Sequence, residues 1–133
     1  MERVVVDSSV WIEIERNPGK FDQLIDKRFH LLLPAIVLAE LQEDAQGSSA
    51  NEAQRQRAME FIHVVETISE FVSIDREVVH RYGELRMFCR QNGRPRAFAD
   101  LLIAATAIQM DAAILSLDKR ARFAELPNLR VVS

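Results

Sequence analysis

Cysteine is almost absent from this chain of 133 residues, which contains only Cys89. A single cysteine forms no internal disulfide, so we expect either a reducing compartment or a thiol without a redox role. The amino terminus also lacks the apolar segment of a signal peptide. The longest apolar run, around residues 31–39, is too short to span a bilayer and contains Pro34. These absences predict a cytoplasmic protein that does not enter membranes.

The chain has no excess of positive charge. Its 17 Lys and Arg residues are outnumbered by 20 Asp and Glu residues, which gives a formal net charge of −3. Proteins that bind nucleic acid regardless of sequence usually show a basic excess, so this balance disfavours that class but allows a local basic strip. Zinc is disfavoured too, because Cys89 and the histidines (His30, His63 and His80) do not show the spacing of a zinc site.

Short apolar runs alternate with amphipathic segments along the chain. The runs predict buried strands, and apolar residues at helical spacing predict helices. Strands are expected around 4–6, 31–33, 71–74, 112–115 and 129–132, and helices around 8–16, 21–28, 34–46, 53–68, 78–89, 101–110 and 119–126, with a linker-like stretch at 47–49. This alternation indicates a single α/β domain over residues 1–133, with a parallel sheet covered on both faces. In such sheets, ligands gather outside the carboxyl ends of the strands.

Four acidic residues stand against apolar sequence where strands change to helices: Asp7, Glu40, Asp100 and Asp118. Each of the three aspartates has a simple structural explanation as a helix cap, which typically contributes about 1 kcal/mol. Glu40 is harder to explain this way, because it lies within a helix, one turn from Ile36 on the apolar face, where an unpaired carboxylate is costly to bury.

Considered together, the four acids favour a bound cation. Two like charges about 4 Å apart repel by roughly 4 kcal/mol at an effective dielectric constant near 20, so a cluster either raises its own pKa values or binds a cation. Carboxylate oxygens suit Mg²⁺ or Mn²⁺. Ser116 lies two residues before Asp118 at the same strand end. Its hydroxyl either orients a water or an acidic ligand there, or simply bonds to the backbone.

Four segments in order along the chain resemble the PIN-domain family, and specifically the VapC-type toxins of bacterial and archaeal toxin–antitoxin pairs. They are residues 4–12, 33–41, 100–107 and 114–118, the last followed by Phe123. The stretch between Leu41 and Gly47 and the basic segment after Asp118 depart from the family pattern, which leaves open whether a second metal ion binds. The resemblance extends over almost the whole chain.

The resemblance implies a three-layer α/β/α sandwich with a central, mainly parallel, twisted sheet. It also implies a Mg²⁺- or Mn²⁺-dependent endoribonuclease. In this sequence the metal-binding and catalytic acids of the family fall on Asp7, Glu40, Asp100 and Asp118, and its catalytic hydroxyl falls on Ser116. Further implications are a homodimer and a VapB-like antitoxin whose carboxyl-terminal segment lies in the active-site groove, in a heterotetramer or a larger assembly.

Basic residues near the acids are candidates for binding RNA phosphates. Arg94 and Arg96 lie in the segment that leads to Asp100, which we expect on the rim of the site, and Lys119 and Arg120 follow Asp118. Arg81 and Arg86 are interpreted instead as part of a solvated helix face, paired with Glu77 and Glu84. Trp11 and Phe98 are possible stacking surfaces for unpaired bases. Aromatic residues beside apolar neighbours are more often core residues or dimer contacts, and we expect both to be core residues.

Two other functions are compatible with clustered acids. A receiver-like signalling domain also gathers aspartates at strand ends and binds Mg²⁺, although Asp7 has no second acid beside it and no activating lysine is evident after 71–74. A PIN-like scaffold that binds without catalysing is the other alternative, and the presence of all four acids argues against it.

Overall fold

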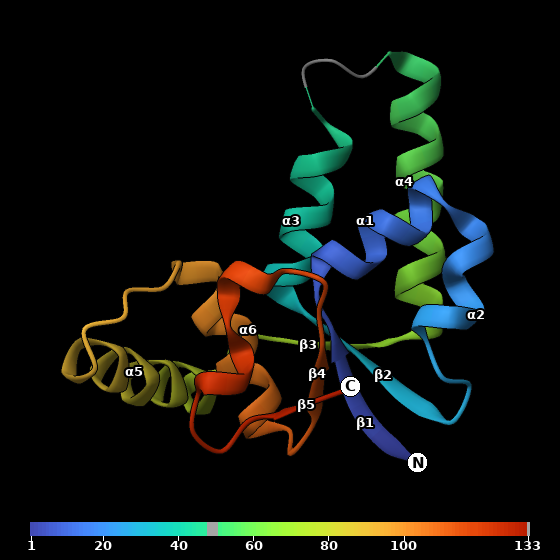
Figure 1. The fold of residues 1–133 in the computed structure, drawn as a ribbon. Helices are drawn as coiled ribbons and strands as arrows, with labels where there is room; N and C mark the ends of the chain where they lie inside the picture. Colours follow the sequence, from blue (N-terminus) through green and yellow to red (C-terminus); the bar gives the residue numbers. More distant parts are fainter. Residues whose placement is uncertain (48–50, 133) are drawn as a thin grey trace.

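The computed structural model describes residues 1–47 and 51–132, which form a five-stranded sheet flanked by helices (Figure 1). In chain order, the elements are β1 (Glu2–Val6), α1 (Ser8–Arg16), η1 (Pro18–Lys20), α2 (Phe21–Leu24), β2 (Phe29–Pro34), α3 (Ala35–Ala45), α4 (Glu52–Ile68), β3 (Glu70–Val72), α5 (Arg76–Gln91), α6 (Phe98–Gln109), β4 (Ala113–Leu115), η2 (Lys119–Ala121), η3 (Phe123–Glu125) and β5 (Arg130–Val131). The linker-like stretch predicted at 47–49 includes Ser48 and Ser49, which lie outside the described residues.

The sheet is parallel throughout, in the order β3-β2-β1-β4-β5. Its central strand, β1, contains Val4, Val5 and Val6, all fully buried. This is the pattern expected of a β-branched run covered on both faces. The order also differs from the 2-1-3-4-5 order of receiver domains, so the receiver-like alternative is wrong.

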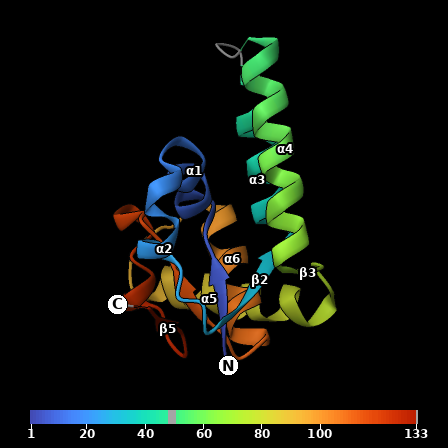
Figure 2. The same ribbon diagram turned by 90° about the vertical axis from the view of Figure 1, so that its right-hand side faces the viewer.

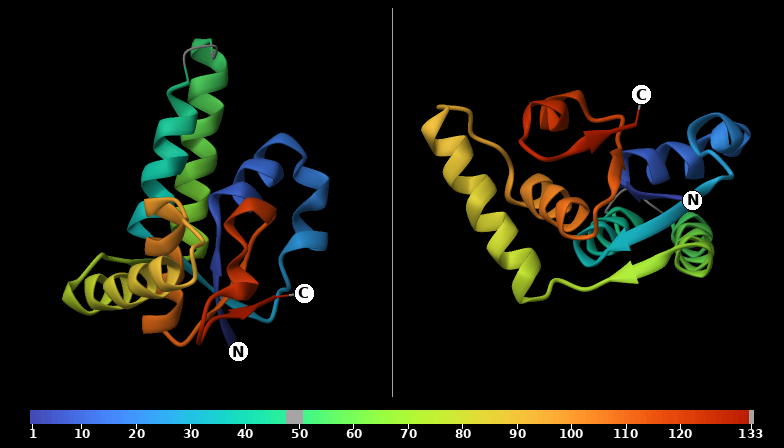
Figure 3. Two further views of the ribbon diagram at one scale, coloured as in Figure 1. Left: turned by 60° about the vertical axis from the view of Figure 1, so that its left-hand side comes forward. Right: turned by 90° about the horizontal axis from the view of Figure 1, so that it is seen from below.

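Helices cover both faces of the sheet and confirm the predicted three-layer arrangement. Figures 2 and 3 show α1 and α2 on one side of the strands and α5 and α6 on the other. Helix α6 packs on β1 and β4. All its residues from Leu101 to Ala107 are buried, as their apolar character on every side predicts.

A pair of helices, α3 and α4, extends beyond the carboxyl ends of the strands (Figure 1). Helix α3 begins immediately after β2, with Pro34 as the last strand residue and the helix N-cap. Helix α4 begins with a capping box, in which the Asn51 side chain accepts from the Gln54 backbone and the Gln54 side chain accepts from the Asn51 backbone. Helix α3 also packs on α1, so it lies beside the segment that follows β1.

Two predicted helices differ from the structure. The helix expected at 21–28 ends at Leu24, because residues 25–28 turn back toward β2 and the Asp26 carboxylate accepts hydrogen bonds from the backbone and side chain of Arg28. The helix expected at 119–126 is two short 3-10 helices, η2 and η3. Arg122 joins them in the left-handed conformation, with φ 48° and ψ 48°, which ends the first helix.

Candidate functional site

Asp7 occupies the junction between β1 and α1 and is only 3% exposed. Parallel pairing aligns Val6 with Leu115, so the residues that follow each strand lie side by side. The Asp7 backbone N–H donates to Leu115 O at 2.9 Å. Its carboxylate accepts three hydrogen bonds: Oδ1 from the Ser8 backbone N–H at 2.8 Å, and Oδ2 from the hydroxyls of Ser9 at 3.0 Å and Ser116 at 2.7 Å. The carboxylate is therefore both buried and fixed in orientation.

The two serine hydroxyls also bind the turn after β4. Ser9 Oγ accepts from the Leu117 backbone N–H, and Ser116 Oγ accepts from the Asp118 backbone N–H, both at 3.0 Å. Each hydroxyl oxygen already accepts a hydrogen bond from a backbone N–H, so the hydroxyl proton is directed at the Asp7 carboxylate. We call Ser9, Ser116 and Asp7 the serine–aspartate bridge. It joins the end of β1 to the end of β4.

Ser9 belongs to this site, although it was not among the site residues predicted from the sequence. It lies in the first turn of α1, whose N-cap is Asp7. One signal was available in the sequence: a hydroxyl two residues after an aspartate at the start of a helix is well placed to bond back to that side chain.

Glu40 and Asp100 bring two more carboxylates to the same edge. Glu40 lies on α3, half-buried, and its Oε1 accepts from the Ser8 hydroxyl at 3.1 Å. Burial raises the pKa of Glu40, and the nearby charges of Asp7 and Asp100 raise it further, against the effect of the Ser8 hydrogen bond. Asp100 lies in the first turn of α6, where Ala97 is the N-cap, so the capping explanation for Asp100 is wrong.

The pKa of Asp100 shows that the cluster is crowded with negative charge. Burial is the largest cause that raises the pKa of Asp100 to about 6; the charges of Asp118 and Asp7 contribute to the same rise, and the Arg96 guanidinium opposes it. Asp7 is connected to Glu40 through Ser8 and to Asp118 through Ser116. The coupling of Asp100 with Asp7 and Asp118 agrees with a position at the same edge, because such coupling weakens with distance. Asp118 is the N-cap of η2, with Oδ1 accepting from the Arg120 backbone N–H at 2.9 Å. The Asp118 carboxylate therefore caps η2 as well as adding negative charge to the cluster.

The donor set of this cluster consists of carboxylate and hydroxyl oxygens, which suits hard divalent cations such as Mg²⁺ and Mn²⁺. Within residues 1–47 and 51–132, no three acidic, His or Cys side chains are close enough together to hold a metal ion as a group. A cleft of about 450 Å³ opens beside Glu40, between α1, α3 and the start of α6. Its walls include Ser8, Glu43 and Ala99.

The basic residues predicted to line the rim have different positions. Lys119 and Arg120 are exposed next to Asp118, and Arg94 is exposed but forms an ion pair with Glu125. Arg96 corrects the prediction: its side chain is only 1% exposed, and its guanidinium donates to backbone carbonyls inside the molecule. From its position in the sequence, Arg96 was expected on the rim. Its hydrogen-bond acceptors belong to a distant segment, and bonding to them buries the guanidinium.

The two aromatic residues considered as base-stacking surfaces also differ from each other. Trp11 is fully buried, with Phe61 edge-on at 6.3 Å between ring centroids, which confirms the prediction of a core residue. Phe98 is 59% exposed and lies edge-on against Tyr82, with ring centroids 5.3 Å apart, so the prediction of a core residue is wrong for Phe98. Arg81 and Arg86 were expected to pair with Glu77 and Glu84. Arg81 forms an ion pair with Glu84, which confirms that prediction, whereas Arg86 donates to the Tyr82 hydroxyl.

Solved structures with the same fold include chains of toxin–antitoxin complexes. VapBC2 from Rickettsia felis, bound to a DNA fragment from its promoter, matches with a TM-score of 0.82 and 22% identity over 98% of this chain and 97% of that one. DNA-bound VapBC from Salmonella typhimurium matches with a TM-score of 0.81 and 20% identity over 99% and 98%. VapC20 from Mycobacterium tuberculosis, a Sarcin-Ricin loop cleaving toxin, matches with a TM-score of 0.68 and 16% identity over 96% and 98%.

A search of curated protein sequences found no match. In the described part of the chain, no helix is long and apolar enough to cross a membrane. Residues 4–129 match the family model of the PIN domain. Since that match covers nearly all of the sequence and agrees with the fold, this protein belongs to the PIN-domain family.

Proposed function

We propose that this protein is a Mg²⁺- or Mn²⁺-dependent endoribonuclease that hydrolyses phosphodiester bonds of RNA as the toxin of a toxin–antitoxin pair. The observation that carries the proposal is the convergence of acidic residues at the carboxyl edge of a PIN-domain sheet, where Ser8 bonds to both Asp7 and Glu40 and Ser116 bonds to Asp7 and to the Asp118 backbone. Asp100, at the start of α6, is coupled to Asp7 and Asp118 by charge. The similarity to VapBC complexes supports a VapB-like antitoxin as the partner. A homodimer, a heterotetramer or larger assembly with that antitoxin, and action in the cytoplasm belong to the same proposal.

Asp7 and Asp100 are the principal candidates to hold the divalent ion, with Glu40 and Asp118 beside them. Mg²⁺ in proteins is usually held by one or two carboxylates and several waters, so a loose acidic cluster is suitable. When bound, such an ion supplies a Lewis acid for the phosphate and makes a water more acidic. Ser116 contributes by keeping the Asp7 carboxylate in one orientation through its 2.7 Å hydrogen bond.

The remaining chemistry falls to side chains around the ion site. Glu40 has Oε1 bonded to Ser8, while Oε2 has no hydrogen-bond partner among the residues that the structure describes. Burial raises the pKa of Glu40, the change that suits a carboxylate to accept a proton near neutral pH. We therefore assign Glu40 Oε2 as the proton acceptor for the attacking water. The cleft beside Glu40 gives that water and the RNA strand access.

Phosphate binding is assigned to Lys119 and Arg120, which are exposed beside Asp118. Contacts of this kind position the RNA backbone and do not read its sequence. Arg94 remains a candidate for the same role, although it must leave its ion pair with Glu125 to bind a phosphate. Arg96 is excluded from this role, since its guanidinium is buried.

The test is cleavage of end-labelled single-stranded RNA by purified protein in Mg²⁺ or Mn²⁺. We expect cleavage with either metal, none in excess EDTA, and a loss of roughly 100-fold or more in the Asp100→Asn variant. Asp22→Asn, which changes an exposed aspartate on α2, is the matched control and should retain activity. Full wild-type activity in EDTA would reject the metal mechanism. Binding of RNA without cleavage would favour the non-catalytic scaffold.

Metal binding is also measurable without RNA. A ligand that binds only the folded state at ten times its Kd stabilises that state by about 1.4 kcal/mol. For 133 residues this corresponds to a rise in Tm of about 5 °C. We expect this rise in wild type and a much smaller one in Asp100→Asn.

A further inference from the structure

Arg96 is a buried arginine with an unusual set of partners. It lies between α5 and α6, and its side chain is 1% exposed. Nε donates to Ala121 O at 2.9 Å, Nη2 donates to Arg122 O at 3.2 Å, and Nη1 lies 3.4 Å from Cys89 Sγ. Its nearest carboxylate is Glu125, with an N–O distance of 3.5 Å. A buried charge is costly unless it is paired and hydrogen-bonded, so these contacts are needed to retain the arginine.

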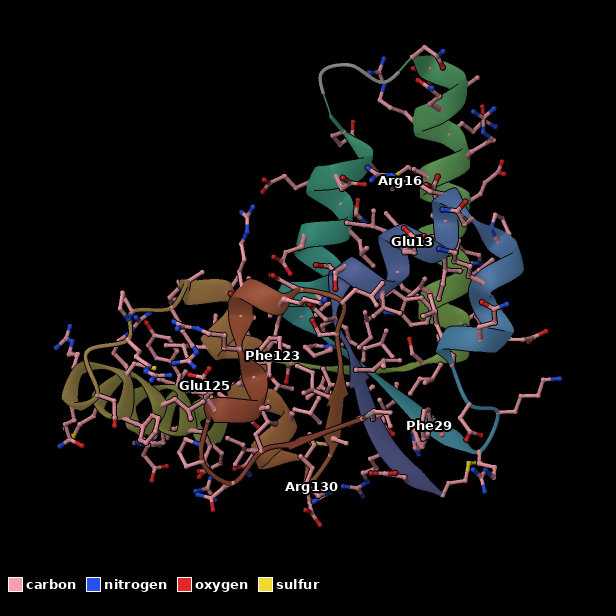
Figure 4. All side chains as sticks on the ribbon, viewed as in Figure 1. Glu13, Arg16, Phe29, Phe123, Glu125 and Arg130 are labelled. Carbon is pink, nitrogen blue, oxygen red and sulfur yellow. The ribbon has the colours of Figure 1, made fainter. Side chains whose placement is uncertain are left out.

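These contacts connect the two segments that carry Asp100 and Asp118. Asp100 follows Arg96 by four residues, in the first turn of α6, and both carbonyl acceptors lie in the segment directly after Asp118. Figure 4 labels Phe123 and Glu125 on that segment. The guanidinium thus joins the segment before α6 to Ala121 and Arg122, which follow Asp118 in the chain, whereas Ser116 of the serine–aspartate bridge precedes Asp118.

The segment held by Arg96 needs an external constraint. Arg122 adopts a left-handed conformation, with φ 48° and ψ 48°, which is unfavourable for a residue with a Cβ atom. Its carbonyl is one of the two acceptors of the Arg96 fork. Strained backbone of this kind persists where surrounding contacts fix it. Without those two hydrogen bonds, we expect the chain after Asp118 to relax and Asp118 to move relative to Asp100.

We propose that Arg96 is a positioning residue that fixes Asp118 against Asp100 and thereby sets the affinity of the carboxylate cluster for its divalent cation. The proposal rests on the proposed function, because it presumes that the cluster binds a metal. Arg96 acts on the cluster through the backbone that it holds and through its positive charge near Asp100. Its buried guanidinium does not contact RNA. The Arg96→Lys variant keeps the charge and loses the hold on the backbone. A change at Arg96 therefore affects metal affinity more than RNA affinity.

The test compares wild type with Arg96→Lys, which keeps the positive charge but loses the planar fork that reaches two carbonyls at once. We expect the Kd for Mn²⁺, measured by titration calorimetry without RNA, to rise about tenfold. The Mn²⁺ concentration for half-maximal cleavage should rise similarly, while the KM for RNA at saturating Mn²⁺ stays the same. Arg90→Lys, an exposed change on α5, is the control and should leave the Mn²⁺ Kd as in wild type.

Each outcome has a defined meaning. A folded Arg96→Lys variant with the wild-type Kd for Mn²⁺ overturns the inference and leaves the proposed function standing. A wild-type protein that binds no Mn²⁺ removes the proposed function and this inference with it. Should Arg96→Lys not fold, the same measurement is made in the Arg122→Gly background, where relief of the left-handed strain assists folding. If that variant does not fold either, Arg96 serves stability alone and the inference is wrong.

Discussion

Removal of the two hydroxyls of the serine–aspartate bridge tests its geometry directly. Ser9 and Ser116 donate to the same oxygen, Oδ2 of Asp7, whose residue is only 3% exposed. A hydrogen bond to a charged group contributes about 1.5–3 kcal/mol net. Each single change to alanine should therefore lower the free energy of unfolding by about 2 kcal/mol in metal-free protein. With an unfolding entropy of about 0.28 kcal/mol/K for 133 residues, Tm falls by about 7 °C.

The double variant Ser9→Ala/Ser116→Ala gives a more specific prediction than either single variant. After one change, Oδ2 still has a hydroxyl donor; after both, a buried carboxylate oxygen has none, which costs more than either single loss. We expect the double variant to lose at least about 1 kcal/mol more than the sum of the two single variants. Urea unfolding of the four proteins in EDTA, followed by circular dichroism, measures this coupling. Ser73→Ala, an exposed change after β3, is the control and should stay within about 0.5 kcal/mol.

Additivity of the two serine variants within about 0.5 kcal/mol would refute the reasoning, because it would mean that the hydroxyls do not share one acceptor. EDTA is essential to this measurement. A divalent ion would itself neutralise Asp7 and mask the loss of the donors.

Two further predictions concern charge. Burial raises the pKa of Asp100 from 3.8 to about 6, so the folded state holds this proton more tightly than the unfolded state and loses stability as the pH rises between these values. In EDTA, the advantage of Asp100→Asn over wild type in unfolding free energy should therefore grow between pH 4 and pH 6, and a constant difference would contradict the assignment. Lys119→Gln and Arg120→Gln, tested in the inactive Asp100→Asn background by fluorescence anisotropy, should each reduce the salt dependence of RNA binding by about 0.7 in log–log slope. An unchanged slope would remove these residues from the RNA interface.

The strands and the edge that carries the acids were predictable because the signals are local. Three consecutive valines before Asp7 predict a strand covered on both faces, and strands that alternate with helices predict a parallel sheet. In such a sheet the carboxyl ends share one edge. The meeting of Asp7 with Ser116 and Asp118 therefore followed from sequence position, and the structure confirms it.

The positions of several side chains were not predictable, because they depend on contacts between distant segments. Arg96 is buried because carbonyls 25 and 26 positions later accept its hydrogen bonds, and nothing in residues 94–98 signals that partner. Phe98 is exposed although its neighbours are apolar. The left-handed Arg122, which divides a predicted helix into η2 and η3, is also fixed from outside its own segment.

The four carboxylates do not support a metal site equally. Asp7 caps α1 and Asp118 caps η2, so both have structural reasons to be acidic even in a protein without a metal. The Asp100 carboxylate has no hydrogen-bond partner in residues 1–47 and 51–132, and the Glu40 carboxylate has only the Ser8 hydroxyl.

Glu40 and Asp100 are therefore the two acids whose presence the fold alone does not explain. Both have a pKa raised first by burial and then by the negative charges around them, which means that their ionised forms destabilise the metal-free protein. Replacement of either carboxylate by the corresponding amide, Glu40→Gln or Asp100→Asn, would remove its repulsion with the surrounding negative charges. Groups that are unfavourable for stability, yet gathered at a strand edge, are characteristic of a site kept for its chemistry. The case for a bound cation therefore rests more on these two residues than on the better-ordered Asp7.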